Sequence, residues 1–159
     1  MESRRGDTNT PTMANSYVQI YIHITFHVKD DNKIDKVDLS SLYRYIAGII
    51  HHENAELLAS GGTTNHIHLL TTLPKTLSIS QFVMKIKANS SRWLKEQGSQ
   101  YRMFAWQDGY GAFSVSASVV NKVVGYINNQ EEHHRKHNYK DEMISFLEAY
   151  HLQYDEQYI

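Results

Sequence analysis

Two histidines separated by one residue are the first candidates for chemistry in this sequence. His66 and His68 flank Ile67 in a segment rich in apolar residues. Side chains alternate along a β-strand, so on a strand both imidazoles project from one face, about 7 Å apart along the chain. Such a pair can bind one divalent cation and leave its other coordination positions open to substrate. The same spacing fits two histidines on a half-exposed strand, so the pair alone leaves both interpretations open.

Tyr126 and Gln130 form a second candidate pair, four residues apart. On a helix they share a face and lie one turn from each other. The amide oxygen of a glutamine can complete a metal site begun by two imidazoles, and a tyrosine can act as a covalent nucleophile. Its phenol has an ordinary pKa of about 10 and therefore needs activation. Because the chain contains 11 tyrosines, a packing or surface role for Tyr126 also stays open.

A second group of histidines follows shortly after this pair, in the run His133-His134-Arg135-Lys136-His137. His133 and His137 have the spacing of two metal ligands on a helix. Basic residues also accumulate at the C-terminal ends of helices, where they interact favourably with the helix dipole. We favour this second interpretation, a solvated helix end, over a second metal site.

The elements that must position these residues are predicted from hydrophobic periodicity and from turn residues. Strands are expected at 17–28, 55–60 and 65–72 with two short ones within 101–116, and helices at 39–54, 77–97, 119–134 and 140–150. This order predicts an α+β fold, with an antiparallel sheet and helices packed on one face. It is the ferredoxin-like or RRM-like order β-α-β-β-α-β, followed by C-terminal helices. Gly125 is unusual inside a helix, and we interpret it as a point of close approach by a sheet or a nucleic-acid backbone.

Length and composition indicate one globular domain. The 159 residues contain 41% hydrophobic and 21% charged residues, which is ordinary for such a domain. Residues 1–16 are polar and are predicted to be a disordered leader, with a single domain over 17–159. The absence of cysteine excludes disulfides and thiolate metal sites. No apolar run is long enough for a membrane span, so we expect a cytoplasmic protein without membrane partners.

Charge is unevenly distributed along the chain, although the formal net charge is only −1. Residues 75–102 contain six Lys or Arg against one Glu, and residues 131–159 contain three against seven Asp or Glu. This pattern is compatible with one electropositive face, and equally with a solvated helix followed by a solvated tail.

With these pieces in order, the sequence resembles the single-tyrosine HUH transposases of short insertion sequences and REP elements. The name describes a His-hydrophobe-His motif, here His66-Ile67-His68. The resemblance runs over nearly the whole chain from Tyr17 onward. Its pieces are the first strand with His23, then residues 65–70, 84–92, 104–111 and 126–134, and a last acidic helix with Asp141 and Glu142.

The resemblance implies a role for each candidate residue. His66, His68 and Gln130 would bind a divalent metal ion, Mg²⁺ or Mn²⁺, and Tyr126 would be the catalytic nucleophile. The reaction implied is cleavage and rejoining of single-stranded DNA through a 5′-phosphotyrosine intermediate. It needs no nucleotide cofactor, in agreement with the lack of a phosphate-binding glycine–lysine loop in the sequence.

The resemblance also implies partners: a DNA hairpin at the element end, and a second copy of the chain. In such a homodimer the tyrosine helix can act in trans, and the protein is nucleoid-associated when bound to DNA. We place the hairpin contacts on Lys85, Lys87 and Arg92, whose cations would bind phosphates. Lys85 and Arg92 are seven apart and share a helix face, whereas Lys87 lies well round the helix.

One departure from the family's pattern concerns the metal. The residue before the first histidine is often Asp in the family and is Asn65 here. Asparagine can orient an imidazole by hydrogen bonding but adds no charge, so we expect a lower metal affinity. The alternatives to an active transposase are a weak or silent hairpin-binding protein, a replication initiator or relaxase on the same scaffold, and a small metal hydrolase that does not use Tyr126.

Overall fold

The computed structural model describes residues 16–159, so the predicted disordered leader lies outside the described residues except for Ser16. Nine longer elements make up this part of the chain, joined by loops and short 3-10 turns. They are β1 (Tyr21–His27), α1 (Leu39–His52), β2 (Leu57–Gly62), β3 (His66–Thr72), α2 (Ile79–Gln97), β4 (Gly111–Val115), α3 (Val120–Asn128), α4 (Gln130–His133) and α5 (Tyr139–Ala149).

The strands form one sheet in the order β2-β3-β1-β4, and each neighbouring pair is antiparallel. Helix α1 connects β1 to β2, and β3 lies between these two strands in the sheet. Helix α2 makes the corresponding connection from β3 to β4, with β1 between them. This is the split β-α-β arrangement of ferredoxin-like folds, so the predicted α+β fold is confirmed.

One face of the sheet carries the main apolar core. Ile22, Ile24 and Phe26 of β1 alternate onto this face beside Ile67 and Leu69 of β3. Helices α1 and α2 cover them, and the two helices also contact each other. The capping box at Ser78 fixes where α2 begins, because the Ser78 side chain accepts a hydrogen bond from the Gln81 amide.

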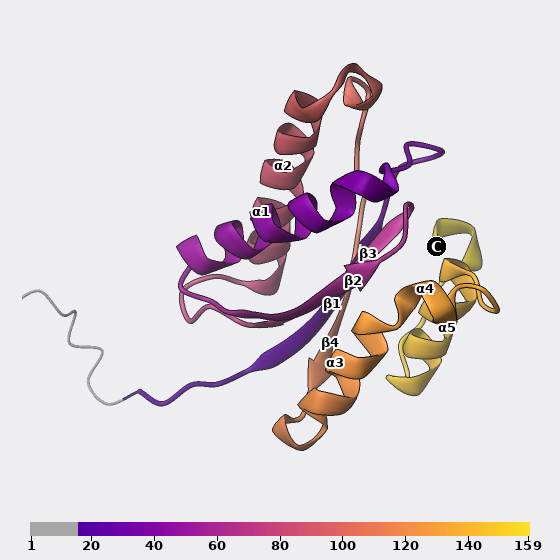
Figure 1. Cartoon of the computed structure of the whole chain (residues 1–159). Coiled ribbons are helices and arrows are strands. Elements are labelled where there is room, and N and C mark those ends of the chain that lie inside the picture. Colours follow the sequence, from indigo (N-terminus) through magenta and orange to yellow (C-terminus); the bar gives the residue numbers. More distant parts are fainter. Residues whose placement is uncertain (1–15) are drawn as a thin grey trace, which may run out of the picture.

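The opposite face is also covered, by α3, α4 and α5 (Figure 1). Here Ala59 and Leu70 pack against Ile127 of α3, and the side chains of His23 and His68 are buried. The expectation that the helices lie on one face is therefore right for α1 and α2 and wrong for the C-terminal helices. The physical reason is that β2 and β3 carry buried side chains on both faces, so each face needs a covering layer.

Two further expectations differ from the structure. Residues 101–116 form one strand, β4, and an isolated bridge between Val28 and Trp106, instead of two strands. The expected helix over 119–134 is divided at Asn129 into α3 and α4.

The close approach between a helix and the sheet occurs at Gly61, so the interpretation of Gly125 as a contact with the sheet is wrong, whereas an approach by a nucleic-acid backbone stays a prediction. A Cβ atom on Gly61 would lie 2.2 Å from the backbone oxygen of Ile127, so only glycine lets α3 pack this closely on β2. A Cβ atom on Gly125 would meet nothing within 4 Å. The helix that carries Tyr126 is thus positioned by the end of β2, which extends to Gly62, two residues beyond the expected limit of this strand.

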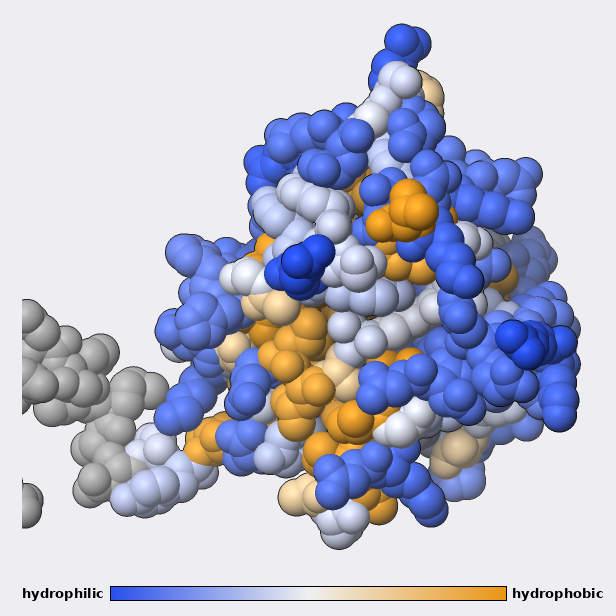
Figure 2. Space-filling model, in the orientation of Figure 1, coloured by the Kyte–Doolittle hydropathy of each residue, from blue (hydrophilic) through white to orange (hydrophobic). Residues whose placement is uncertain are grey.

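Figure 2 shows that hydrophilic residues cover most of the face seen in Figure 1, with hydrophobic residues reaching the surface near its middle. Exposed apolar residues of this kind are ordinary on folded proteins. Within residues 16–159, none of the helices has the length and apolar character that crossing a bilayer requires.

Candidate active site

His66 is held in one orientation by its neighbours in the chain. Its Nδ1 lies 2.7 Å from Asn65 Oδ1 and 3.0 Å from Thr63 Oγ1. Since the Thr63 hydroxyl also donates to Asn65 Oδ1, the imidazole donates from Nδ1 and presents the lone pair of Nε2 on its other side. Asn65 therefore supplies the orienting hydrogen bond that the sequence predicted for this position, without adding a charge.

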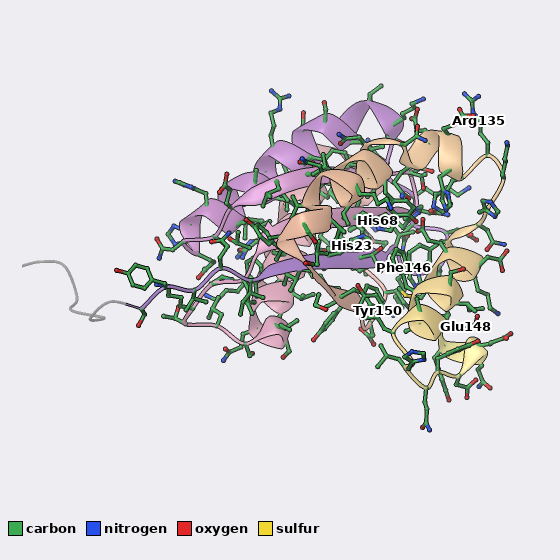
Figure 3. All side chains as sticks on the ribbon, turned by 90° about the horizontal axis from the view of Figure 1, so that it is seen from below. His23, His68, Arg135, Phe146, Glu148 and Tyr150 are labelled. Carbon is green, nitrogen blue, oxygen red and sulfur yellow. The ribbon has the colours of Figure 1, made fainter. Side chains whose placement is uncertain are left out.

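His68 is fixed by a contact from the neighbouring strand. Its Nδ1 lies 2.7 Å from Nε2 of His23 on β1, and its Nε2 lies 2.7 Å from Oε1 of Glu142 on α5. Figure 3 shows His23 and His68 between the sheet and α5, close to Phe146 of that helix. The two imidazoles can exchange the roles of donor and acceptor, so His23 can stabilise either tautomer of His68. Burial lowers the pKa of His23 from 6.5 to about 3, so this residue is neutral near pH 7.

Gln130 reaches the histidines from the first residue of α4. Its Oε1 lies 3.2 Å from Nε2 of His66, and its side chain is almost fully buried. The lone pair of that nitrogen and the amide oxygen thus face each other, an arrangement of two acceptors that a cation between them stabilises. Gln130 and Tyr126 do not lie on one continuous helix, because the break at Asn129 separates them. They stay one turn apart, and Gln130 Nε2 donates to the backbone oxygen of Tyr126 at 3.4 Å.

Tyr126 lies beside this group, half-buried, with its ring centroid 5.9 Å from that of His68. Its hydroxyl donates a hydrogen bond to Oε2 of Glu142. Burial, reinforced by this hydrogen bond to a carboxylate, raises the pKa of Tyr126 above its ordinary value. The phenol is therefore protonated in this state of the protein.

Glu142 is a residue of the site that the sequence had placed only in an acidic helix. It is 5% exposed, and its two oxygens face different partners. Burial opposes its negative charge, but hydrogen bonds from His68 and Tyr126 outweigh this and lower the pKa of Glu142 to about 2. A sequence pattern did exist: Tyr139, Glu142, Met143 and Phe146 follow helical spacing, so Glu142 lies within the apolar stripe of α5.

The interpretation of residues 133–137 as a solvated helix end is wrong for two of its histidines. The His134 side chain is 10% exposed, and its Nε2 lies 3.2 Å from Oε2 of Glu142. His133 Nε2 is at the same distance from this oxygen but is buried without an aligned hydrogen bond. Because the chain reverses after α4, this short basic segment folds back over the site, and of its three histidines only His137 is exposed.

The donor set fits a divalent cation. Ligand atoms of His66, His68, His134 and Glu142 all lie within 4.8 Å of one another, and the Gln130 oxygen adjoins His66. In octahedral sites with bonds of about 2.1 Å, ligand atoms are about 3 Å apart when adjacent and about 4.2 Å apart when opposite. Burial lowers the pKa of His66 to about 3, so its lone pair is available at neutral pH. Nitrogen and oxygen donors of this kind suit Mn²⁺ at least as well as Mg²⁺.

The basic residues of α2 lie apart from this site, because α2 covers the other face of the sheet. Lys85 is exposed and forms an ion pair with Glu53 at 3.3 Å, and Arg92 is exposed two turns further on. Lys87 is half-buried, and its Nζ donates to the backbone oxygens of Gln107 and Gly109 at 2.6 and 2.8 Å. These bonds attach the loop before β4 to α2.

Comparisons with known proteins give one matching family and two solved structures with a similar fold. The sequence profile of the family described as Transposase IS200 like matches residues 16–130. A solved structure from Deinococcus radiodurans R1, described as a "putative transposase", is 20% identical with a TM-score of 0.56, and the alignment covers 76% of this chain and 98% of that one. A REP-associated tyrosine transposase bound to a REP hairpin is 15% identical with a TM-score of 0.54, covering 76% and 72%. The search of curated proteins found no match to this sequence.

The profile match spans well over half of the chain and includes the histidine pair, Tyr126 and Gln130. It ends before α5, so Glu142 lies outside it. The two solved structures agree with the ferredoxin-like sheet described above. The chain therefore belongs to the IS200-like transposase family.

Proposed function

We propose that this protein is an active transposase that cleaves and rejoins single-stranded DNA at hairpin-bearing element ends, with Tyr126 as the nucleophile. One observation carries this proposal: the Tyr126 hydroxyl converges with His66, His68 and Gln130 on one small buried group. The histidine pair comes from β3, and Tyr126 and Gln130 come from α3 and α4. Chain connectivity brings the members of each pair together, but it does not require the two pairs to meet.

In the proposed reaction, the phenol oxygen of Tyr126 forms a bond to the scissile phosphorus while the bond from phosphorus to the 3′ oxygen breaks. The products are a 5′-phosphotyrosine and a free 3′ hydroxyl. The phenol gives up one proton and the departing 3′ oxygen takes one up, so the step releases and consumes no protons overall. Attack by a 3′ hydroxyl on the phosphotyrosine later rejoins the strands, and no nucleotide hydrolysis is needed.

His66, His68 and Gln130 are the residues that would hold the cation, Mg²⁺ or Mn²⁺. When bound, the cation would polarise the scissile phosphate and offset its developing negative charge. Asn65 and His23 position the two imidazoles through their Nδ1 atoms, so their role is to aim the lone pairs of the ligands.

Access for the DNA strand is provided by a cavity of about 410 Å³ between Tyr126 and α5. Tyr126 and Glu142 line this cavity, and Phe146 and Ala149 contribute apolar surface. We infer that the scissile phosphate approaches Tyr126 from this side, because His66 and His68 are fully buried.

The position of Tyr126 next to the histidines of its own chain favours attack in cis. The proposed homodimer is compatible with this, since each subunit then contains a complete site. An arrangement in trans would require α3 and α4 to leave the contact with β2 that Gly61 permits.

For the DNA hairpin we propose Lys85 and Arg92 as phosphate contacts, supported by the hairpin bound to the REP-associated structural neighbour. Both side chains are exposed on α2.

Lys87 was predicted as a third contact. Its bonds to two carbonyl oxygens make it first a support for the loop before β4, and a DNA contact only through that loop.

The test is incubation of the protein with labelled single-stranded DNA carrying a candidate hairpin and Mn²⁺, followed by a denaturing gel. We expect a covalent protein–DNA adduct with the wild type and none with Tyr126→Phe. Tyr45→Phe, which removes a hydroxyl from α1, is the matched control and should still form the adduct. Cleavage that survives Tyr126→Phe would reject this nucleophile, and hairpin binding without cleavage by the wild type would favour a silent binding protein.

A further inference from the structure

We propose that Glu142 is a fourth protein ligand of the metal site, and that its second oxygen holds the Tyr126 hydroxyl next to the metal. This inference rests on the proposed metal site of His66, His68 and Gln130 and extends it. It assigns a direct role to α5, which lies outside the residues matched by the family's sequence profile.

The position of Oε1 supports ligation. This oxygen lies 2.7 Å from Nε2 of His68 and 3.8 Å from Nε2 of His66. Both distances are close to the range of about 3 to 4.2 Å between donor atoms around one octahedral cation. A cation shared by the two imidazoles would therefore meet Oε1 without a rearrangement of α5.

The other oxygen of the carboxylate has a different set of partners. Oε2 accepts the hydrogen bond of the Tyr126 hydroxyl, and Nε2 of His134 lies 3.2 Å away. The carboxylate thus spans from the nucleophile to the imidazoles, with one oxygen for each. A ligand of this kind fixes the distance between the phenol and the metal, which is what in-line attack on a metal-bound phosphate requires.

Charge also favours an anionic ligand here. Two neutral imidazoles and one amide would leave both positive charges of the cation uncompensated in a buried site, and burial of unpaired charge is costly. Asn65 contributes no negative charge. Glu142 is the acidic side chain buried against these ligands in the described part of the chain, and it lies on the face of α5 that Met143 and Phe146 otherwise make apolar.

Calorimetric titration of the metal-free protein with Mn²⁺ tests this assignment without relying on activity. We expect Glu142→Gln and Glu142→Ala to weaken Mn²⁺ binding by about 10- to 100-fold, as for other residues that support a metal. Asp141→Asn is the matched control, because it removes the same charge from the adjacent, exposed position of α5 and should leave the affinity unchanged. Circular dichroism of each variant confirms that it is folded.

A second readout follows the helix itself. If Glu142 binds the metal, Mn²⁺ should slow amide hydrogen exchange in α5 of the wild type and have no such effect in Glu142→Gln. Unchanged or tighter Mn²⁺ binding by the Glu142 variants would overturn the inference, tighter binding showing that the carboxylate competes with the metal. Failure of the proposed metal site is a separate result: His66→Ala and His68→Ala would then also leave Mn²⁺ binding unchanged.

Discussion

The two faces of the sheet are made by the same strands and are stabilised in different ways. On the face under α1 and α2, side chains such as Ile24 and Leu69 are fully buried in an apolar core. On the face under α3 to α5, the neighbouring residues His23 and His68 are as deeply buried, but their imidazoles also form buried hydrogen bonds.

This difference separates stability from chemistry within one strand. In β3, Ile67 and Leu69 alternate with His66 and His68, so a single residue step leads from the core to the site. The apolar face stabilises the fold by burying apolar surface, so a polar substitution there lowers the free energy of unfolding. The histidine face buries polar groups, which costs free energy unless they are hydrogen-bonded. We expect the function of this face to depend on how those groups are arranged.

The largest effect on stability is expected on the apolar face. Leu69→Ala removes a fully buried side chain from the centre of the sheet and should lower the free energy of unfolding by about 2–5 kcal/mol. Urea denaturation measures this, and Mn²⁺ affinity of the folded variant should stay within a factor of about three of the wild type. A large loss of Mn²⁺ affinity would show that the two faces are not independent.

A smaller effect is expected where α3 packs on β2. Gly61→Ala places a Cβ atom against the backbone of Ile127 and should destabilise the protein by about 1–3 kcal/mol. It should also weaken Mn²⁺ binding, because α3 and the Gln130 that follows it must shift. Gly125→Ala is the matched control: its Cβ atom has open space, and the change should stabilise the helix by about 0.5–1 kcal/mol. Equal effects of the two substitutions would contradict this account of the packing.

Acid should destabilise the protein through the histidine face. Burial lowers the pKa of His23 and of His66 from 6.5 to about 3, so both stay neutral in the folded protein while the unfolded chain binds protons. Their contribution is complete above about pH 6.5 and is lost progressively as the pH falls toward 3. Between pH 7 and pH 5 the free energy of unfolding of the metal-free protein should fall by at least about 1 kcal/mol.

The apolar face supplies the control for this pH dependence. Leu69→Ala should lower the free energy of unfolding by the same amount at pH 7 and at pH 5, because it changes no titrating group. His23→Gln should reduce the change in the free energy of unfolding between pH 7 and pH 5. A wild-type stability that does not change between these pH values would show that the two histidines are protonated inside the fold.

The smallest effect is expected on DNA binding at α2. Lys85→Ala and Arg92→Ala should each reduce the slope of log affinity against log salt concentration by about 1, as for the loss of one phosphate contact. Lys87→Ala should instead destabilise the loop at Gln107 and Gly109. Fluorescence anisotropy with a labelled hairpin gives the slopes, and unchanged slopes for both exposed residues would place the hairpin elsewhere.

The sequence predicted that His66 and His68 lie close together, and likewise Tyr126 and Gln130, because the information for each pair is local. The period of two in β3 places His66 and His68 on one face, and the spacing of Tyr126 and Gln130 brings them within one turn. The fold class also follows from the order of the elements. The family resemblance is confirmed by the profile match, and the role proposed for each residue rests on that resemblance.

Glu142 could not be located in this way. Its contact with His68 joins residues 74 positions apart, and it depends on how α5 packs against the sheet. The acidic residues around it were compatible with a solvated tail, and the basic residues beside His134 suggested a solvated helix end. The count of charges along the chain gave no sign that Glu142, on the apolar face of α5, is buried.

The central claim is tested most directly by peptide mass spectrometry of the covalent adduct formed with hairpin-bearing single-stranded DNA and Mn²⁺. After digestion of protein and DNA, we expect the peptide that contains Tyr126 to carry a 5′-phosphonucleotide on its phenol oxygen. The modification should be absent when His66 and His68 are both replaced by alanine. A nucleotide attached to any other residue, or cleaved DNA with no attached peptide, would contradict the account.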